Sequence, residues 1–214
     1  MRIPLINQLK KRQQIDIALL QDEVIRIVYL VSDDMVLHGG TAIWRCYSGK
    51  RFSEDIDLYS TAFSGLIDKF RKIAATHGLA ISKMKDTGNV ISATVLSGKT
   101  AVRLEVNHAS KVNGTIVSYQ LVDGSEIEVL SLTPEQLINE KIDAYSDRLF
   151  IRDIYDIYKL VPLGALNEST LARLRVFLHN IQTPVDESIL KSLVYIGLAP
   201  SFERMINEIG RYLT

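Results

Sequence analysis

The first part of the chain carries alternating helical and strand patterns. Residues 4–31 have apolar side chains at roughly helical spacing with charged residues between them, which predicts an amphipathic helix. A short apolar run over 35–38 ends at Gly39-Gly40 and predicts a buried strand followed by a tight turn. A short helix over 41–47 is expected after this turn.

The middle of the chain is rich in β-forming residues. Acidic and apolar residues alternate over 55–59 with the period of two that is typical of a strand. A helix over 63–77 is expected to end at Gly78. Between residues 79 and 130, turn signals such as Asn113-Gly114 separate short β-rich runs. This pattern predicts an antiparallel meander with strands over 90–96, 101–106, 115–121 and 127–130.

The pattern is helical from Leu132 onward. Thr133 is a predicted N-cap, with Pro134 at the first helical position and Gln136 three residues after the cap. The apolar positions before and after Leu149-Phe150 cannot lie on one face of a straight helix. We therefore expect two helices there, with the second running through Val161. Further helices are predicted over 167–180, 186–196 and 200–213. The whole pattern predicts an α+β fold with two domains, an α/β core in residues 1–131 and a helical domain in residues 132–214.

The composition argues against several classes of protein. The 214 residues are 47% hydrophobic and 23% charged, as in a globular protein, which excludes wholesale disorder. The 25 Lys and Arg residues balance the 25 Asp and Glu residues, which argues against nucleic-acid binding by bulk charge. The single Cys46 excludes an internal disulfide. No run approaches the roughly 20 apolar residues of a membrane span, and the polar N-terminus is unlike a secretory signal, so we expect a cytoplasmic protein without membrane association.

Two segments suggest a metal and phosphate site. Asp55 and Asp57 point to the same face of the predicted strand, roughly 7 Å apart, where they repel each other. Magnesium favours such oxygens and tends to keep substrate phosphates as further ligands. Gly39-Gly40 at a strand-to-helix turn would let a phosphate approach backbone amides. The alternative is an exposed pair of acidic residues next to an ordinary turn, but the combination and order of both segments favour the site.

Two further segments carry charged residues on shared faces. Glu105 is a candidate third carboxylate if its strand lies beside the Asp55 strand; otherwise it pairs with Arg103 on a solvated face.

Cations on two successive helical faces are candidates for clamping a triphosphate. These faces hold Lys141, Tyr145 and Arg148, then Arg152, Tyr155, Asp156 and Lys159. A charged face exposed to solvent is the alternative.

Three strings in the sequence together resemble a known family. They are His38-Gly39-Gly40-Thr41-Ala42, Arg51-Phe52-Ser53-Glu54-Asp55-Ile56-Asp57-Leu58, and Lys141 and Arg148 followed by Arg152-Asp153-Ile154-Tyr155-Asp156. Their order and spacing are similar to those of the AbiEii/AbiGii toxin nucleotidyltransferases of the DNA polymerase β-like superfamily. The resemblance covers about residues 35–160. It implies a polymerase β-like core, with a mixed sheet flanked by helices, and a helical C-terminal region.

The resemblance also implies roles for single residues. Asp55 and Asp57, with Glu105 as a third carboxylate through its strand context, would hold Mg²⁺. The catalytic set would be completed by Lys141, Asp153 and Asp156, and the two aspartates would either orient the cations or receive the attacking group. Nucleotide binding would involve Gly39, Gly40, Thr41, Arg51, Ser53, Lys141, Arg148 and Arg152.

The implied activity is magnesium-dependent transfer of a nucleoside monophosphate from a nucleoside triphosphate to a hydroxyl group. The acceptor would be a tRNA or a protein, and an antitoxin would restrain the enzyme if it acts as a toxin. The alternative is a catalytically silent protein of the same fold that works through a partner.

Overall fold

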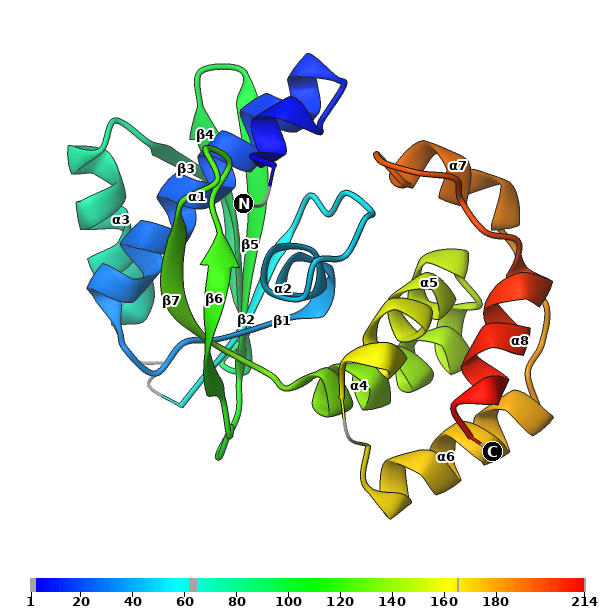
Figure 1. The fold of residues 1–214 in the computed structure, drawn as a ribbon. Coiled ribbons are helices and arrows are strands. Elements are labelled where there is room, and N and C mark those ends of the chain that lie inside the picture. Colours follow the sequence, from blue (N-terminus) through cyan, green and yellow to red (C-terminus); the bar gives the residue numbers. More distant parts are fainter. Residues whose placement is uncertain (1–2, 62–64, 165, 214) are drawn as a thin grey trace.

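The computed structural model describes residues 3–61, 65–164 and 166–213. In this part of the chain a seven-stranded mixed sheet is followed by a group of helices that stands beside it (Figure 1). The strands are β1 (Val36–His38), β2 (Ile56–Ser60), β3 (Ala80–Asp86), β4 (Val90–Ser97), β5 (Thr100–His108), β6 (Thr115–Gln120) and β7 (Glu126–Ser131). The α-helices are α1 (Arg12–Val31), α2 (Gly39–Cys46), α3 (Leu66–Thr76), α4 (Pro134–Arg148), α5 (Ile151–Leu160), α6 (Glu168–His179), α7 (Leu190–Leu193) and α8 (Phe202–Arg211). The predicted α+β class is confirmed.

The sheet order brings distant parts of the sequence together. The strands lie in the order β3-β4-β5-β2-β1-β7-β6. β2 is antiparallel to β1 but parallel to β5, and β1 is parallel to β7. In this register Asp57 stands level with His38 on one side and with Glu105 on the other. The centre of the sheet therefore joins three segments that carry polar candidates.

The predicted meander is wrong at its middle. β3, β4 and β5 form one antiparallel run and β6 and β7 form a hairpin, but β1 and β2 lie between these two units. Asn113-Gly114 is therefore part of a crossover rather than a hairpin turn. Gly114 is needed there for close packing, because a β-carbon at this position would lie 2.9 Å from Val36 Cγ2.

Strand β3 is missing from the predicted elements. It is an edge strand whose residues are mostly exposed, so it lacks the apolar alternation that marks the other strands. Lys83 has a positive φ of 49°, and the pairing register with β4 shifts between Ser82 and Lys85. This irregularity also interrupts the period of two.

The N-terminal helix begins later than the sequence predicts. Leu5–Asn7 forms a 3₁₀ turn and α1 starts at Arg12. The Ile6 N–H donates a hydrogen bond to Val122 O at 3.0 Å, and Leu5 and Leu9 are buried. Packing against the β6–β7 turn thus takes these apolar residues out of the helix.

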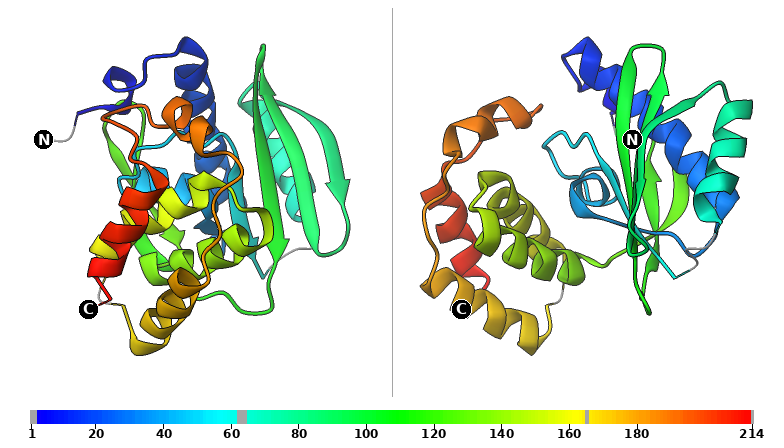
Figure 2. Two further views of the ribbon diagram at one scale, coloured as in Figure 1. Left: turned by 90° about the vertical axis from the view of Figure 1, so that its right-hand side faces the viewer. Right: turned by 180° about the vertical axis from the view of Figure 1, so that it is seen from behind.

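Helices α1 and α3 cover one face of the sheet, and α2 lies on the other face (Figures 1 and 2). In β2, Ile56 and Leu58 are fully buried, whereas Asp57 and Tyr59 are half-buried. Helix α3 ends before Gly78, which has a φ of +71° as a helix-terminating glycine requires. The predicted start of this helix at Phe63 lies outside the described residues.

The helical part begins as its sequence predicts. The Thr133 side chain accepts a hydrogen bond from the Gln136 N–H, and the Gln136 side chain accepts one from the Thr133 N–H, which completes the capping box of α4. Leu149 adopts a left-handed conformation with a φ of 56° between α4 and α5. The predicted helix break is confirmed at this residue.

The predicted helix over 186–196 is only partly formed. It consists of a 3₁₀ turn, Glu187–Ile189, and the short α7. Beyond α7 the chain extends, because Val194 forms a β-bridge with Arg51 and the Tyr195 N–H donates to Lys50 O at 3.1 Å. The C-terminal part is thereby attached to the loop that carries Arg51.

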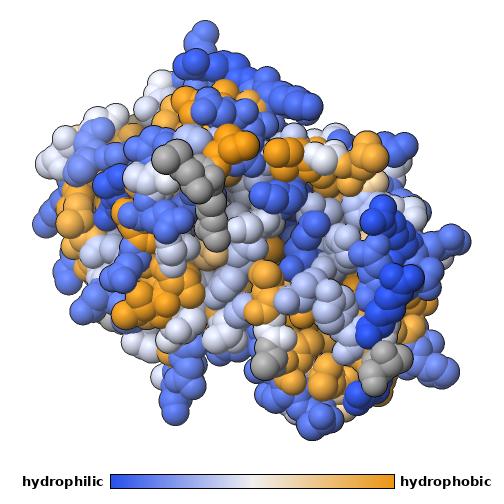
Figure 3. Space-filling view, viewed as in Figure 1, coloured by the Kyte–Doolittle hydropathy of each residue, from blue (hydrophilic) through white to orange (hydrophobic). Residues whose placement is uncertain are grey.

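The surface seen from the side of Figure 1 shows several separate apolar patches among hydrophilic residues (Figure 3). Of the helices in the described ranges, none combines the length and the apolar character needed to span a membrane.

Candidate active site

The glycines after β1 lie against three predicted site residues. Both belong to the first turn of α2 instead of forming a turn before it. A β-carbon at Gly39, whose φ is +69°, would lie 2.6 Å from Asp57 Oδ2. A β-carbon at Gly40 would lie 2.6 Å from both Ser53 Oγ and Arg51 Nη2. The absence of side chains at these two positions is therefore what lets the start of α2 meet Asp57, Ser53 and Arg51.

Asp55 and Asp57 are two neighbouring carboxylates without partners. Neither side chain makes a hydrogen bond or an ion pair with another described residue. Burial is the largest cause that raises the pKa of Asp57, and Asp55 and Glu105 raise it further. The charges of His38 and Lys141 act in the opposite direction without outweighing these effects. The structure thus keeps like charges close together at the start of β2, where no basic side chain pairs with them.

Glu105 lies on β5, directly beside Asp57 of β2. The strand of Glu105 thus lies beside the strand that follows Asp55, which is the condition for Glu105 to be a third carboxylate of the site. Its carboxylate, however, accepts a hydrogen bond from Arg103 Nη2 and a longer one from Asn107 Nδ2 at 3.4 Å. Glu105 therefore combines both alternatives: it stands beside the aspartates and it pairs with Arg103.

The donor set of the site fits a divalent metal that is shared with a phosphate. Across the described ranges, no group of three or more His, Cys, Asp or Glu side chains is gathered closely enough to hold a metal ion by itself. Asp55 and Asp57 instead provide an incomplete oxygen set. Magnesium is commonly bound by one or two carboxylates together with substrate phosphates, so an incomplete set of this kind suits it.

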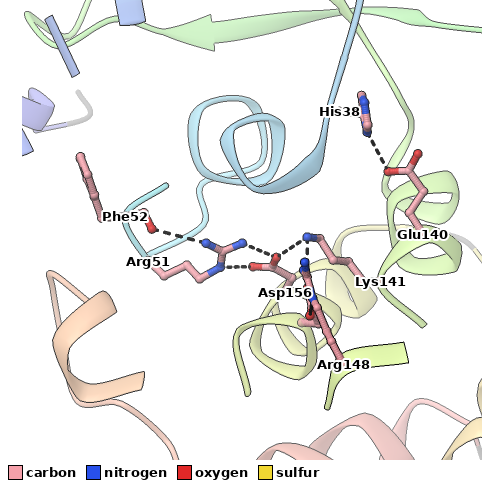
Figure 4. A network of polar contacts seen from close by, with 8 residues as sticks. His38, Arg51, Phe52, Glu140, Lys141, Arg148 and Asp156 are labelled. Atoms are coloured by element: carbon pink, nitrogen blue, oxygen red, sulfur yellow. Dashed lines mark hydrogen bonds and ion pairs between the residues drawn. The ribbon is translucent and has the colours of Figure 1, made fainter. Parts of the chain in front are cut away.

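A largely buried ion-pair network includes Arg51, which lies against Gly40 (Figure 4). Arg51 binds Asp156 with two hydrogen bonds, from Nε at 2.6 Å and from Nη2 at 2.5 Å. Lys141 Nζ lies 3.3 Å from an oxygen of Asp153 and 3.2 Å from one of Asp156. Arg148 binds Asp153 with two hydrogen bonds of 2.8 Å. Three cations thus share two carboxylates, and the network has an excess of one positive charge.

Contacts within the network favour the charged forms of Asp153 and Arg51 although both side chains are buried. Burial opposes the charge of Asp153, but the hydrogen bonds from Arg148 and the charge of Lys141 outweigh it and lower its pKa. Burial likewise opposes the charge of Arg51, and the contact with Asp156 raises its pKa. The alternative of a charged helix face exposed to solvent is excluded for Lys141, Asp153 and Asp156, because all three are buried.

Two other candidates lie at the margin of this arrangement. The Thr41 hydroxyl donates to the backbone oxygen of Asp55, so its side chain fixes the chain just before β2. The guanidinium of Arg152 lies 5.4 Å from the centre of the Phe150 ring. No hydrogen bond or ion pair joins the Arg152 side chain to another candidate residue in the described ranges.

The sequence patterns did not single out a second cluster beside Asp57. The His38 ring stacks on Tyr59 with centroids 4.0 Å apart, and His38 Nδ1 lies 3.3 Å from Glu140 Oε2. The Tyr59 hydroxyl donates to Glu140 Oε1 at 2.8 Å. Burial opposes the charge of Glu140, but the contact with His38 and the hydrogen bond from Tyr59 outweigh it and lower its pKa. The only sequence signal for Tyr59 is its position two residues after Asp57, on the same face of the strand.

A buried glutamine outside the candidate set also supports the site. Gln21 of α1 donates two hydrogen bonds of 3.0 Å, to the backbone oxygens of Ser53 and Glu54. Its position on the buried side of the amphipathic helix α1 gives no sequence signal of this role. Gln21 and Thr41 together hold the chain that leads into Asp55.

The family follows from a comparison of the sequence with family models. The model described as the nucleotidyl transferase AbiEii toxin of type IV toxin–antitoxin systems matches residues 28–204. The chain belongs to the AbiEii family. The matched region includes both the glycines with the aspartate pair and the buried network, and it identifies the protein as a nucleotidyltransferase of a toxin family. No curated protein sequence matches the chain.

Solved structures share the fold of this AbiEii protein. JHP933 from Helicobacter pylori superposes with a TM-score of 0.66 and 22% identity, over 92% of this chain and 90% of that one. MenT4, a nucleotidyltransferase toxin from Mycobacterium tuberculosis, superposes with a TM-score of 0.64 and 14% identity, over 94% of this chain and 83% of that one. The predicted nucleotidyltransferase fold is therefore confirmed over nearly the full chain.

Proposed function

We propose that this AbiEii protein transfers a nucleoside monophosphate from a nucleoside triphosphate to a hydroxyl group of a tRNA or a protein, using Mg²⁺. The observation that carries the proposal is the position of Asp57. It lies against Gly39 at the start of α2, beside Asp55, and makes no hydrogen bond or ion pair with a basic side chain in the described part of the chain. A metal bound to phosphate would relieve the repulsion at this point.

The phosphates are proposed to lie between the start of α2 and the buried network. Backbone N–H groups at a helix N-terminus attract anions, and the absence of side chains at Gly39 and Gly40 leaves them accessible. Lys141 and the remaining N–H groups of Arg51 and Arg148 would face the β- and γ-phosphates, with Ser53 as a further hydrogen-bond donor. Asp153 and Asp156 already bind these three cations, which favours the orienting role for both aspartates over the role of attacking-group acceptor.

The chemistry is a substitution at the α-phosphorus. The acceptor oxygen forms a bond to this phosphorus, the bond to the bridging oxygen breaks, and pyrophosphate leaves with the electron pair. Asp55 and Asp57 would hold Mg²⁺, which neutralises charge on the phosphates when it is bound. Glu105, on the strand beside Asp57, is the proposed acceptor of the hydroxyl proton. Residues 132–214 would act as a helical domain that completes the cleft.

Incubation of the purified protein with each labelled nucleoside triphosphate, Mg²⁺, and either total cellular RNA or total protein tests the proposal. We expect label to enter one of the two acceptor pools, and to disappear from it when Mg²⁺ is chelated. Asp57→Asn is expected to remove the labelling. Labelling of neither pool by the wild-type protein, or equal labelling by the variant, would contradict the proposed reaction.

The proposed partner is an antitoxin, since the family is that of type IV toxin–antitoxin systems. A catalytically silent role of the same fold is disfavoured, because both aspartates of the site are retained without structural partners.

A further inference from the structure

A groove adjoins the proposed phosphate site on the side of the His38–Tyr59–Glu140 cluster. Its volume is about 480 Å³. Its walls come from β2, from the crossover between β5 and β6, and from the first half of α4, and they include Tyr59, Lys111, Val112, Asn113, Leu132 and Glu140. None of these residues belongs to the predicted site, so the groove is a separate feature of the tertiary structure.

The groove lies along the strand that carries Asp57. Asp57 lies beside Gly39, and Tyr59, two residues further along β2 on the same face, lines the groove and donates a hydrogen bond to Glu140. On α4, Lys141 binds the buried network, whereas the preceding residue, Glu140, lines the groove. A nucleotide whose phosphates lie beside Gly40 and whose α-phosphate lies beside Asp57 would extend its sugar and base in this direction.

The lining of the groove gathers no excess of positive charge that would bind a polyphosphate. Lys111 lines it together with Glu140 and Asp143, and Asp143 is already paired with Arg173. The ring of Tyr59 is held rigidly by its stacking on His38 and its hydrogen bond to Glu140. Val112 and Leu132 supply apolar contact area beside it. A flat, neutral, mostly apolar ring system satisfies these surroundings.

The rim offers groups that are able to recognise the edge of a base. The side chains of Lys111 and Asn113 are exposed and have no hydrogen-bond partner among the described residues. A carboxamide both donates and accepts hydrogen bonds, as the edges of nucleobases do. The Gln136 side chain, by contrast, is occupied by the Thr133 N–H and by the backbone oxygen of Asn113.

A large acceptor has another approach to the carboxylates. The helical part stands over the other half of the sheet, and the face of β4 and β5 next to Glu105 remains largely uncovered (Figure 2). The groove has room for one nucleoside rather than for a macromolecular surface.

We propose that this groove is the nucleoside subsite, in which the base and ribose of the nucleoside triphosphate bind between Tyr59 and the Lys111–Asn113 segment. This inference rests on the proposed function and specifies where the substrate lies. It makes Asn113 and Lys111 the residues that influence which nucleotide is preferred.

Calorimetry with two ligands tests the subsite in the presence of Mg²⁺: each nucleoside triphosphate, and inorganic tripolyphosphate, which lacks the nucleoside. Ala109→Trp fills the groove without removing a side-chain hydrogen bond. We expect it to weaken nucleoside triphosphate binding by about tenfold or more and to leave tripolyphosphate binding unchanged. Val176→Trp, which adds the same bulk to an exposed site on α6, is the control and is expected to change neither.

A second variant keeps the test independent of the folding of the first. Asn113→Ala alters only an exposed side chain, and we expect it to change the order of affinities among the four nucleoside triphosphates. The inference would be overturned if Ala109→Trp weakened the binding of both ligands equally. It would also be overturned if this variant bound nucleoside triphosphate as the wild type does but transferred to the acceptor more slowly. A wild-type protein that binds neither ligand would contradict the proposed function instead.

Discussion

Burial and charge act on the same few side chains at this site. Asp57 is half-buried with two other carboxylates close to it, while Lys141 is buried between two carboxylates of α5. Single substitutions therefore have opposite effects on stability, depending on whether they remove a repelled charge or a paired one. The site thus contains one pair of carboxylates that repel each other, Asp55 and Asp57. It also contains one network in which cations and carboxylates are paired.

The first prediction concerns Asp57. Asp57→Asn is expected to reduce nucleotide transfer by at least about a hundredfold, which corresponds to ~2.7 kcal/mol in activation free energy. The melting temperature of the metal-free protein is expected to stay the same or to rise, because a partly buried charge and its repulsion from Asp55 are removed. Transfer assays and thermal melts check the two parts. Glu128→Gln, at an exposed position of β7, is the control, and a loss of activity that merely follows unfolding would contradict the prediction.

The second prediction concerns pH. The folded chain lowers the pKa of Asp153 from its ordinary value of 3.8, so its ionised form stabilises the fold above about pH 4, and this contribution is lost as pH falls through the lower folded value. Asp153→Asn is therefore expected to cost about 3 kcal/mol at pH 7, since it leaves buried cations without a partner. Urea unfolding at several pH values should show this cost shrinking below about pH 4.

The exposed Asp147 of α4 supplies the control for this experiment, and Asp147→Asn should have almost no effect at any pH. A cost of Asp153→Asn that stays constant from pH 7 to pH 3 would show that the carboxylate is not held in its ionised form by Lys141 and Arg148.

Helix α4 is the element that connects the parts of the site. Its first turn is fixed by the capping box at Thr133, and its middle presents Glu140 to His38 and Tyr59 and Lys141 to the network. Of two adjacent residues of one helix, Glu140 thus lines the groove and Lys141 binds the network beside the proposed phosphate site. The start of this helix also determines where the 132–214 region leaves the sheet.

The third prediction concerns this helix start. Thr133→Ala removes the side-chain acceptor for the Gln136 N–H and is expected to lower the free energy of unfolding by about 1 kcal/mol. Transfer activity at a temperature well below the melting point should remain close to that of the wild type, because no site residue is altered. Urea unfolding and the transfer assay measure the two effects. Ser110→Ala, at an exposed position outside any helix, is the reference, and an equal cost there would contradict the capping argument.

At the scale of the whole molecule, a segment near the C-terminal end is attached to α2 and to the loop that carries Arg51. Trp44 Nε1 donates to the Tyr195 hydroxyl at 3.0 Å, and the Phe52 N–H donates to Leu193 O at 2.9 Å. These contacts hold the C-terminal part against the loop of Arg51. This attachment lies within residues 28–204, the region that matches the AbiEii family model.

The fourth prediction concerns the cell. Expression of the chain by itself is expected to slow bacterial growth, because the family is one of toxins, and Asp57→Asn at the same expression level is expected not to do so. Growth curves with immunoblots for equal expression measure this. Identical curves for the two forms would remove the toxin role while leaving the transfer reaction open to direct assay.

The local patterns of the sequence determined most of the elements and the polar candidates. The capping box at Thr133, the helix break at Leu149 and the alternation over β2 each depend on neighbouring residues, so their physical causes are visible in the sequence itself. The same holds for Asp55, Asp57 and the Lys141–Asp156 segment, whose spacing fixes the faces on which they lie.

Only the tertiary structure decided how these elements meet. The insertion of β1 and β2 between β5 and β7 comes from pairing between strands that are far apart in the sequence, and turn signals such as Asn113-Gly114 do not distinguish a hairpin from a crossover. The contacts of Glu140 with His38 and of Arg51 with Asp156 likewise join residues about one hundred positions apart. Long-range packing sets these pairs and the groove beside them, because burial depends on which surfaces come together and not on the order of residues within either segment.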